Sequence, residues 1–335
     1  MNSARSAERA LLVAAGGGMG DTLLAGVVAR ALLRRFAAVD AVVLPAHVDV
    51  AAHVPAFGRV LPLGERLRGR YAAAVVTWAT TRNALLPWLA RIPVRVGQAR
   101  RAYSGLFTER VVVRSELGDR TTHWTEILLD YARPLGCDLA DPVPEFAVGD
   151  AERRDAEALL RVHDAATAFY LLHPTRGLSA QRMRWPVDGF VELARRLAAR
   201  DGVPVLVTGS REDAALAQTI ADRAGRGVAS VAGATSVGTF GALAERARAV
   251  VAMDSGPMHV AAAVGAPTVG IFALQSDEPD RWAPRGRRTT LVRPAYPCPA
   301  WHRKETCPDF ACVRALDSGA VLRAIDGLLV AAAER

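Results

Sequence analysis

Short apolar segments alternate along the chain with longer segments in which apolar residues recur at helical spacing. Residues 11–15 form an apolar run of strand length, and residues 22–36, after a glycine loop, have the spacing of an amphipathic helix. Further strands are predicted at residues 41–44, 72–76, 168–172, 203–207, 249–253 and 268–272. Repeated strand–helix units with short loops indicate parallel sheets covered by helices on both faces.

The chain is long enough for two such domains. Its 335 residues exceed the about 100–200 residues of a single domain. The alternation is broken by an arginine-rich stretch at residues 91–114 and by a proline-rich turn at residues 141–144. We therefore predict an α/β protein with two Rossmann-like domains. Their ligands are expected in the loops that follow strands, beyond residues 15, 172, 207 and 253.

The composition is that of a well-buried enzyme, with 51% hydrophobic and 23% charged residues. The apolar segments have strand length and fall far short of the about 20 residues of a membrane span. The first residues contain no long apolar stretch of the kind found in signal peptides. These features predict a cytoplasmic protein.

The charge balance favours an anionic partner. The chain has 42 basic and 34 acidic residues, a net charge of +8, and Lys304 is its only lysine. A GC-rich genome that favours arginine would explain this equally well. Nucleic acid is not expected as a partner, because no helix-turn-helix, zinc-finger or aromatic RNA-binding motif is present. A phosphorylated sugar, or peripheral contact with an anionic inner membrane surface, fits the charge better.

Three of the four cysteines lie close together in the sequence, at Cys298, Cys307 and Cys312. A reducing cytosol disfavours disulfides, and the segment lacks the paired CxxC spacing of a zinc site. Packing as small apolar groups and metal binding both remain open for this segment.

The glycine loop at residues 16–21 precedes the first predicted helix and ends in Asp21. It resembles the G-x-G-x-x-G fingerprint, but Asp21 takes the place of the third glycine, and no P-loop lysine follows. A carboxylate at this place is either a helix cap or a general base. Gly18 and Gly20 have no side chains in this loop, which would let a substrate approach closely.

A second motif, at residues 254–259, reads Asp-Ser-Gly-Pro-Met-His and directly follows a predicted strand. Pro257 suits the first helical turn, and Ser255 and Gly256 would present backbone N–H groups to an anion. His259 would lie on the first turn of this helix. The alternative is an ordinary capped helix with a core histidine.

Two more loops carry candidate ligand-binding residues. Thr175 follows the strand at residues 168–172, and Arg182 and Arg184 lie before the next helix. Guanidinium groups suit phosphate oxygens because their donors match oxygens in pairs. Glu212 follows the next strand, where a carboxylate either binds a ribose hydroxyl pair or caps the helix.

The motifs, taken in order, resemble those of one family. They are the Gly-Asp loop, the His-Pro and Arg-Trp-Pro segments, the Gly-Ser-x-Glu-Asp loop and the Asp-Ser-Gly-Pro-Met-His helix. The chain is similar to the ADP-heptose:lipopolysaccharide heptosyltransferases, glycosyltransferase family nine. The resemblance runs from residue 11 to about residue 325 and includes the cysteine-containing segment. Its most specific part is the motif at residues 254–259.

The resemblance implies the GT-B architecture, with two facing Rossmann-like domains and parallel sheets. Residues 1–150 would hold the acceptor and residues 151–317 the nucleotide sugar, and a helix at residues 318–335 would cross back to the first domain. Asp21 would be the base of an inverting transfer that needs no metal and no cofactor, and Gly18 and Gly20 would lie in the acceptor-side loop. The acceptor would be an anionic glycolipid of lipopolysaccharide assembly or another sugar.

The resemblance also implies roles for the donor-side residues. Glu212 would contact the nucleoside, Asp254 the sugar hydroxyls, and His259 would complete the site. The residues implied around the diphosphate are Thr175, Ser255, Gly256 and Met258.

One position departs from the family pattern. The family often has a lysine two residues before the tryptophan of Trp-Pro, and here that residue is Met183. Arg182 or Arg184 would then supply the charge, although a guanidinium fork differs from a lysine's point charge. A nucleotide-sugar epimerase of the same fold and a non-catalytic nucleotide-sugar-binding protein remain as alternatives. An NAD oxidoreductase is disfavoured, because the third glycine of the fingerprint is missing.

Overall fold

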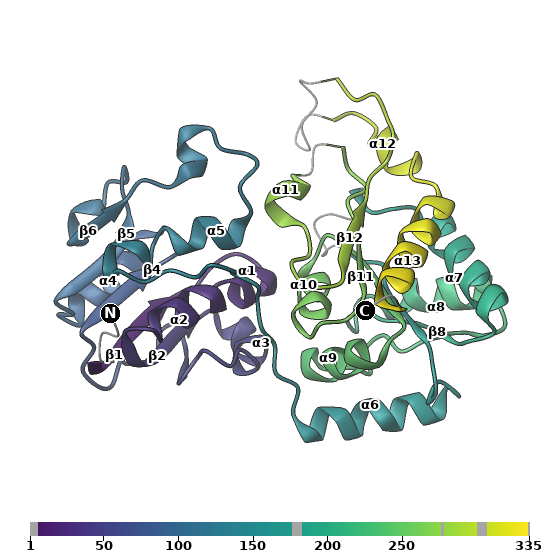
Figure 1. Ribbon diagram of the computed structural model, residues 1–335, viewed down its shortest axis with the longest axis horizontal. Coiled ribbons are helices and arrows are strands. Elements are labelled where there is room, and N and C mark those ends of the chain that lie inside the picture. Colours follow the sequence, from purple (N-terminus) through teal and green to yellow (C-terminus); the bar gives the residue numbers. More distant parts are fainter. Residues whose placement is uncertain (1–5, 176–182, 276–277, 300–306, 334–335) are drawn as a thin grey trace. The chain divides into compact units, whose positions relative to one another are not determined.

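The structure, a computed structural model, describes residues 6–175, 183–275, 278–299 and 307–333. The chain forms two compact units, Met1–Ala147 and Val148–Arg335 (Figure 1). We call them the N-terminal unit and the C-terminal unit and describe each by itself.

The N-terminal unit is built on a six-stranded parallel sheet in the order β3-β2-β1-β4-β5-β6. Its strands are β1 (Ser6–Val13), β2 (Phe36–Val43), β3 (Val60–Pro62), β4 (Ala73–Val76), β5 (Val94–Gln98) and β6 (Glu109–Val111). In register, Leu11 of β1 pairs with Asp40 on one side and Ala74 on the other. The strand order reverses between β1 and β4, and such a switch point is where doubly wound sheets bind ligands.

Helices cover this sheet in the doubly wound pattern. The helices are α1 (Met19–Leu24), α2 (Gly26–Leu32), α3 (Val48–Ala52), α4 (Thr81–Leu89) and α5 (Trp124–Leu129), with short 3₁₀ turns at Pro45–His47, Ser104–Leu106, Arg114–Leu117 and Arg133–Leu135. Helix α2 packs on β1 and β2, and α4 packs on β4 and β5. The central strand residues Leu11, Leu12 and Val13 are fully buried, as expected for strands covered on both faces.

The C-terminal unit repeats this topology, in the order β12-β11-β10-β7-β8-β9. Its strands are β7 (Tyr170–His173), β8 (Val205–Val207), β9 (Val228–Ser230), β10 (Ala249–Met253), β11 (Thr268–Ile271) and β12 (Thr289–Val292). Residues Val250 and Leu171 are paired in register, so β7 and β10 are neighbours. The switch point of this unit therefore lies between β7 and β10.

The helices of the C-terminal unit are α6 (Asp150–Val162), α7 (Val187–Asp201), α8 (Ala214–Ala224), α9 (Val237–Arg246), α10 (Gly256–Ala263), α11 (Pro279–Trp282), α12 (Ala311–Arg314) and α13 (Ser318–Ala333). Helix α6 lies alongside α9, and α13 packs on α7, β11 and β12 (Figure 1). Trp185 is buried, and its Nε1–H donates to Leu316 O at 3.0 Å, which ties the start of α7 to the segment before α13. The crossing of residues 318–335 to the N-terminal domain stays a prediction.

The predicted α/β class with parallel sheets is confirmed, but two segments differ from the sequence-based expectation. The helix expected at residues 22–36 is two shorter helices, and Phe36 already belongs to β2. The arginine-rich stretch at residues 91–114, expected to break the alternation, contains β5 and β6. Within it, the Arg95 guanidinium donates to the carbonyl oxygens of Leu106 at 2.7 Å and Ile92 at 2.6 Å. The charge of Arg95 therefore serves the backbone of neighbouring turns.

Candidate functional site

Asp21 stands at the carboxyl end of β1, next to the switch point of the N-terminal sheet, as the third residue of α1. The N-cap of this helix is Gly18, whose backbone N–H donates to Asp21 Oδ2 at 2.8 Å. Asp21 is therefore not the N-cap itself; it supplies the returning half of a capping box. Its second oxygen, Oδ1, is buried and accepts no hydrogen bond from the residues that the structure describes.

This arrangement affects how readily the carboxyl group loses its proton. Burial raises the pKa of Asp21 above its ordinary value, and the hydrogen bond from the Gly18 N–H offsets only part of that effect. A carboxylate with a raised pKa and one unused oxygen is a stronger base than an exposed one. Such a group at a ligand-binding edge is suited to general-base chemistry.

Asp40 in β2 shows the opposite behaviour for a buried carboxylate. Burial alone would raise its pKa, but hydrogen bonds from Arg59, Arg9 and Tyr71 outweigh this and lower it. Arg59 reaches Oδ2 through Nη2 at 2.8 Å, and the Tyr71 hydroxyl donates to the same oxygen at 2.8 Å. Asp40 is thus a fully paired structural anion, whereas Asp21 is only half satisfied.

Two residues that the sequence analysis did not single out lie in the loops around Asp21. Trp78 follows β4, the strand beside β1, and is packed against the glycine loop at Gly16 and Gly17. His47 follows β2, and its Nδ1 lies 3.0 Å from the hydroxyl of Thr22, the residue after Asp21. Burial lowers the pKa of His47, which favours its neutral form. Their positions after strand ends were the only signal in the sequence.

In the C-terminal unit, the motif at residues 254–259 lies beside the switch point, at the end of β10 and the start of α10. The backbone N–H of Asp254 donates to Ile271 O at 3.1 Å, which fixes the end of the strand. Ser255 is the N-cap, but its hydroxyl donates back to Met253 O at 2.9 Å instead of capping the helix. The start of α10 at Ser255 and Gly256 therefore keeps the character of an anion site.

The last two residues of this motif, Met258 and His259, are buried. Met258 is fully buried and packs with Ala252 and Phe272, and its N–H donates to Ser255 O at 3.1 Å. His259 is also buried, with 5% of its surface exposed. These side chains shape the base of the motif rather than its surface.

Thr175, after β7, belongs to a chain of three side chains. The Thr208 hydroxyl donates to Leu172 O at 3.1 Å and lies 3.0 Å from His173 Nδ1, and His173 Nε2 lies 3.0 Å from the Thr175 hydroxyl. Burial lowers the pKa of His173 to about 4, so the ring is neutral near pH 7. In the sequence His173 stands out only as part of the His-Pro segment, and its role becomes visible through these contacts.

The arginine loop before α7 is described only in part. Arg182 lies outside the described residues. Burial lowers the pKa of the half-buried Arg184, and the nearby charge of Asp213 opposes that effect. Met183, in the position of the family's lysine, packs against the hydrophobic core of this unit. Glu212 is exposed after β8, and hydrogen bonds from its own N–H and from the Ser210 hydroxyl lower its pKa.

All four cysteines are free thiols, with Cys137 and Cys312 buried and Cys298 and Cys307 half-buried. Within the described residues, no group of three or more histidine, cysteine, aspartate or glutamate side chains is placed to hold a metal ion. Cys312 instead accepts a hydrogen bond from the Gln275 backbone N–H, with sulfur and nitrogen 3.4 Å apart. None of the described helices combines the length and apolar character that a membrane span requires.

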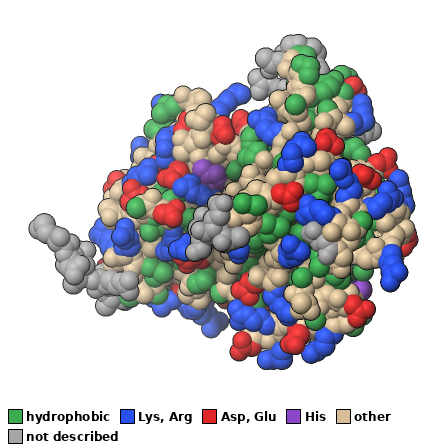
Figure 2. All heavy atoms as spheres, turned by 45° about the vertical axis from the view of Figure 1, so that its right-hand side comes forward, with side chains coloured by type: hydrophobic (Ala, Val, Ile, Leu, Met, Phe, Trp, Pro, Cys, Tyr) green, Lys and Arg blue, Asp and Glu red, His purple; other side chains and the backbone are tan. Residues whose placement is uncertain are grey.

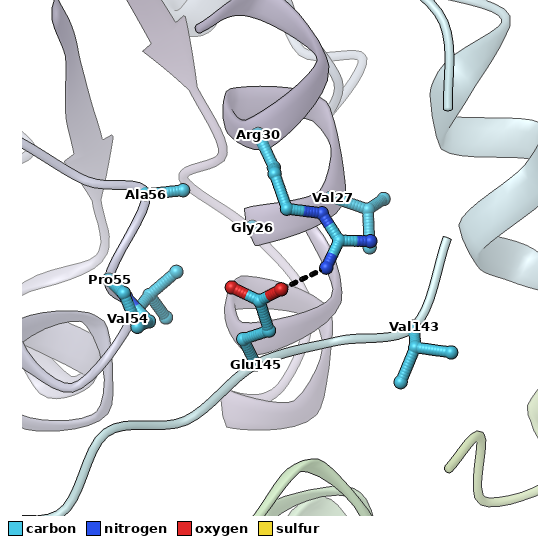
Figure 3. Close-up of a pocket in the computed structure, with 8 residues that line it drawn as sticks. All are labelled: Gly26, Val27, Arg30, Val54, Pro55, Ala56, Val143 and Glu145. Carbon is cyan, nitrogen blue, oxygen red and sulfur yellow. Dashed lines mark hydrogen bonds and ion pairs between the residues drawn. The ribbon is translucent and has the colours of Figure 1, made fainter. Parts of the chain in front are cut away.

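Two further surface features do not add a site. On the face shown in Figure 2, arginine side chains are scattered among acidic ones and do not gather into a single strip. The depression drawn in Figure 3 lies between α2 and the segment around Glu145, and it has no room for a water molecule. There Arg30 forms an ion pair with Glu145 and donates to Asp141 O at 2.7 Å. These contacts fasten the end of the N-terminal unit to α2.

The chain thus has two doubly wound units, each with candidate ligand loops at its switch point, as in the GT-B fold. A model of glycosyltransferase family 9 (heptosyltransferase) matches residues 60–309, and the chain belongs to this family. It is 25% identical over 248 residues to lipooligosaccharide heptosyltransferase 2 of Haemophilus influenzae, covering 69% of this chain and 68% of that protein.

Solved structures show the same fold. A family 9 glycosyltransferase from Veillonella parvula matches with a TM-score of 0.84 at 16% identity, covering 99% of this chain and all of that one. The ADP-heptose lps heptosyltransferase II of E. coli matches with a TM-score of 0.77 at 21% identity, covering 96% and 99%. The resemblance inferred from the motifs is thereby confirmed, and the chain is an enzyme that transfers a sugar. The epimerase and binding-protein alternatives lose their support.

Proposed function

We propose that this enzyme transfers a heptose from ADP-heptose to a hydroxyl group of the lipopolysaccharide inner core or a related glycolipid. Family membership supports the reaction class, and the names of the similar proteins support heptose, ADP and this acceptor. The observation that carries the mechanism is the half-buried carboxylate of Asp21, whose Oδ1 has no hydrogen-bond partner among the described residues, at the switch point of the N-terminal sheet.

In this mechanism Asp21 acts as the general base. Its carboxylate takes the proton of the acceptor hydroxyl while that oxygen attacks the anomeric carbon of the sugar. The bond from this carbon to the diphosphate oxygen breaks, and ADP leaves with the electron pair. Because a single displacement occurs from the face opposite the leaving group, the configuration at the anomeric carbon is inverted.

The C-terminal unit would hold the donor. The start of α10 at Ser255 and Gly256 offers backbone N–H groups to the diphosphate, and Arg184 offers a guanidinium. Asp254 would accept hydrogen bonds from the sugar hydroxyls, and Glu212 from the ribose. Fixed dipoles and a cation can stabilise the departing diphosphate without a metal ion, so we propose a metal-independent reaction.

We also propose a cytoplasmic enzyme that meets its anionic acceptor at the inner membrane surface. The support is the excess of positive charge, +8 in total, which favours encounter with anionic substrates.

The donor assignment is tested by titrating the protein calorimetrically with ADP, UDP and NAD. We expect ADP to bind most tightly, and transfer from ADP-heptose to a core acceptor to continue in the presence of EDTA. Preference for UDP would contradict the donor, and a requirement for Mg²⁺ or Mn²⁺ would contradict the metal-free mechanism.

A further inference from the structure

The two glycines at the start of the Asp21 loop face the indole of Trp78. A Cβ atom placed on Gly16 would lie 2.0 Å from Trp78 Cδ1, far inside van der Waals contact. A Cβ atom on Gly17 would lie 2.9 Å from Trp78 Cζ3, and this residue also has a positive φ of 68°. Glycine is therefore needed here because the indole occupies the space of the missing side chains.

The same place adjoins the Asp21 carboxylate. The Cβ atom built on Gly17 would lie 2.3 Å from Asp21 Oδ2, so the indole and the carboxylate flank the same small space. The glycine loop thus brings together an aromatic ring from the end of β4 and an acid from the start of α1. Packing an apolar ring beside a carboxylate removes water from it.

Asn83 of α4 holds the two loops in this relation. Its Nδ2 donates to Ala15 O at 2.9 Å and to Trp78 O at 3.0 Å. One buried amide therefore links the end of β1 to the end of β4. Because it holds the backbone of Trp78, it also fixes where the indole lies relative to the glycine loop. Asn83 is itself 1% exposed, which makes this link independent of solvent.

We propose that Trp78 is a positioning residue for the transfer reaction: its indole flanks the Asp21 carboxylate from the β4 side and excludes water from it. This inference rests on the proposed role of Asp21 as base. Oδ1 is buried and has no hydrogen-bond partner among the described residues, while Oδ2 accepts from the Gly18 N–H and keeps a second lone pair. Its desolvation agrees with the raised pKa of Asp21.

The test is the dependence of kcat on pH in Trp78→Ala and Trp78→Phe. Without the indole, water reaches Asp21, its pKa falls, and the acidic limb of kcat moves to lower pH by about one unit. We expect kcat of Trp78→Ala to fall about tenfold at neutral pH, part of the about 10²–10⁴-fold that a general base contributes. Trp78→Phe, which keeps an aromatic cover, should retain most of the wild-type profile. Trp88→Ala removes an exposed tryptophan from the same unit and is the matched control.

A second substitution tests the contact without touching Trp78. Gly16→Ala should displace the indole and reproduce the profile of Trp78→Ala, whereas Gly105→Ala, whose Cβ meets nothing within 4 Å, should not. In the double variant Gly16→Ala/Trp78→Ala, the new methyl group enters the space that the indole has vacated. The kcat of the double variant should therefore match that of Trp78→Ala alone.

Two results would overturn the inference: an unshifted acidic limb in Trp78→Ala, or effects of Gly16→Ala and Trp78→Ala that multiply. If Asp21→Asn is inactive while the limb stays unshifted, only the role of Trp78 fails. If Asp21→Asn is active, the proposed base itself is wrong.

Discussion

The hydroxyl group of Thr175 lies 3.0 Å from Nε2 of His173, and we infer the direction of this hydrogen bond from the contacts on the far side of the ring. Thr208 gives its single hydroxyl proton to Leu172 O, so at His173 Nδ1 it must accept. The neutral ring then carries its proton on Nδ1, and Nε2 accepts the proton of Thr175. The Thr175 hydroxyl then has only lone pairs to offer. It cannot bind a phosphate oxygen, because that oxygen needs a hydrogen-bond donor.

The first prediction follows from this polarity. Replacing Thr175 with valine should change the Kd for ADP by less than about twofold, since no hydrogen bond to phosphate is lost. A hydrogen bond to a charged group would be worth about 1.5–3 kcal/mol, or about tenfold and more in affinity. Calorimetric titration of Thr175→Val and Thr175→Ser with ADP distinguishes an unchanged Kd from a loss of this size. A loss of tenfold in the valine variant alone would show that this hydroxyl donates to the diphosphate.

The second prediction concerns the stability of the protein in mild acid. In the unfolded chain histidine binds a proton near pH 6.5, whereas burial holds the pKa of His173 at about 4 in the folded state. Between these values the unfolded state binds more protons, so stability falls as the pH falls. The melting temperature of His173→Gln should therefore decline less between pH 6.5 and pH 4 than that of the wild type. His163→Gln, at the end of α6, is the control and should keep the wild-type slope; equal slopes for all three proteins would refute the assignment.

Asp21 should lower stability at neutral pH. Because burial raises its pKa, the folded state binds a proton more readily than the unfolded chain, and stability is lost as the pH rises through that interval. Each pKa unit corresponds to about 1.4 kcal/mol. Asp21→Asn should therefore melt a few degrees above the wild type at pH 7, with the gain vanishing near pH 4. A variant that melts lower at pH 7 would mean that the charged form is stabilised in the fold.

A further prediction tests whether Arg184 supplies the positive charge that the family's lysine, here Met183, would provide. Arg184 is half-buried near Asp213, and Arg184→Met should weaken ADP binding by about tenfold or more if its guanidinium meets the diphosphate. Arg154→Met on the exposed surface of α6 is the control. Met183→Lys should not rescue the loss, because Met183 packs against the core and a lysine there would lose that contact. Unchanged affinity in Arg184→Met would remove this arginine from the site.

Much of the fold could be predicted because parallel strands are buried on both faces and so appear as continuous apolar runs. The loops after residues 15, 172 and 253 were identified for the same reason, since ligands gather at the carboxyl ends of such strands. The strands β5 and β6 were missed because their arginines hide the apolar pattern. In the fold, the Arg95 guanidinium is accommodated by hydrogen bonds to carbonyl oxygens of neighbouring turns.

The finer features of the site could not be read from the sequence. Trp78 and Asp21 are 57 positions apart along the chain, and only the pairing of β1 with β4 brings their loops together. Likewise, the role of His173 depends on its contact with Thr208, which directly follows β8, the strand that pairs with β7. Periodicity shows which residues share an element, whereas these contacts depend on the order of strands in the sheet.

The central claim is that Asp21 takes the proton of the acceptor. Its most direct test is the turnover of Asp21→Asn with saturating ADP-heptose and a lipopolysaccharide core acceptor, measured beside the Kd for ADP. We predict that turnover falls about 10²–10⁴-fold while the Kd for ADP stays within about twofold of the wild-type value. Asp49→Asn, an exposed acid on α3 of the same unit, should transfer at the wild-type rate. Wild-type turnover in Asp21→Asn would contradict the account and reduce Asp21 to a capping residue of α1.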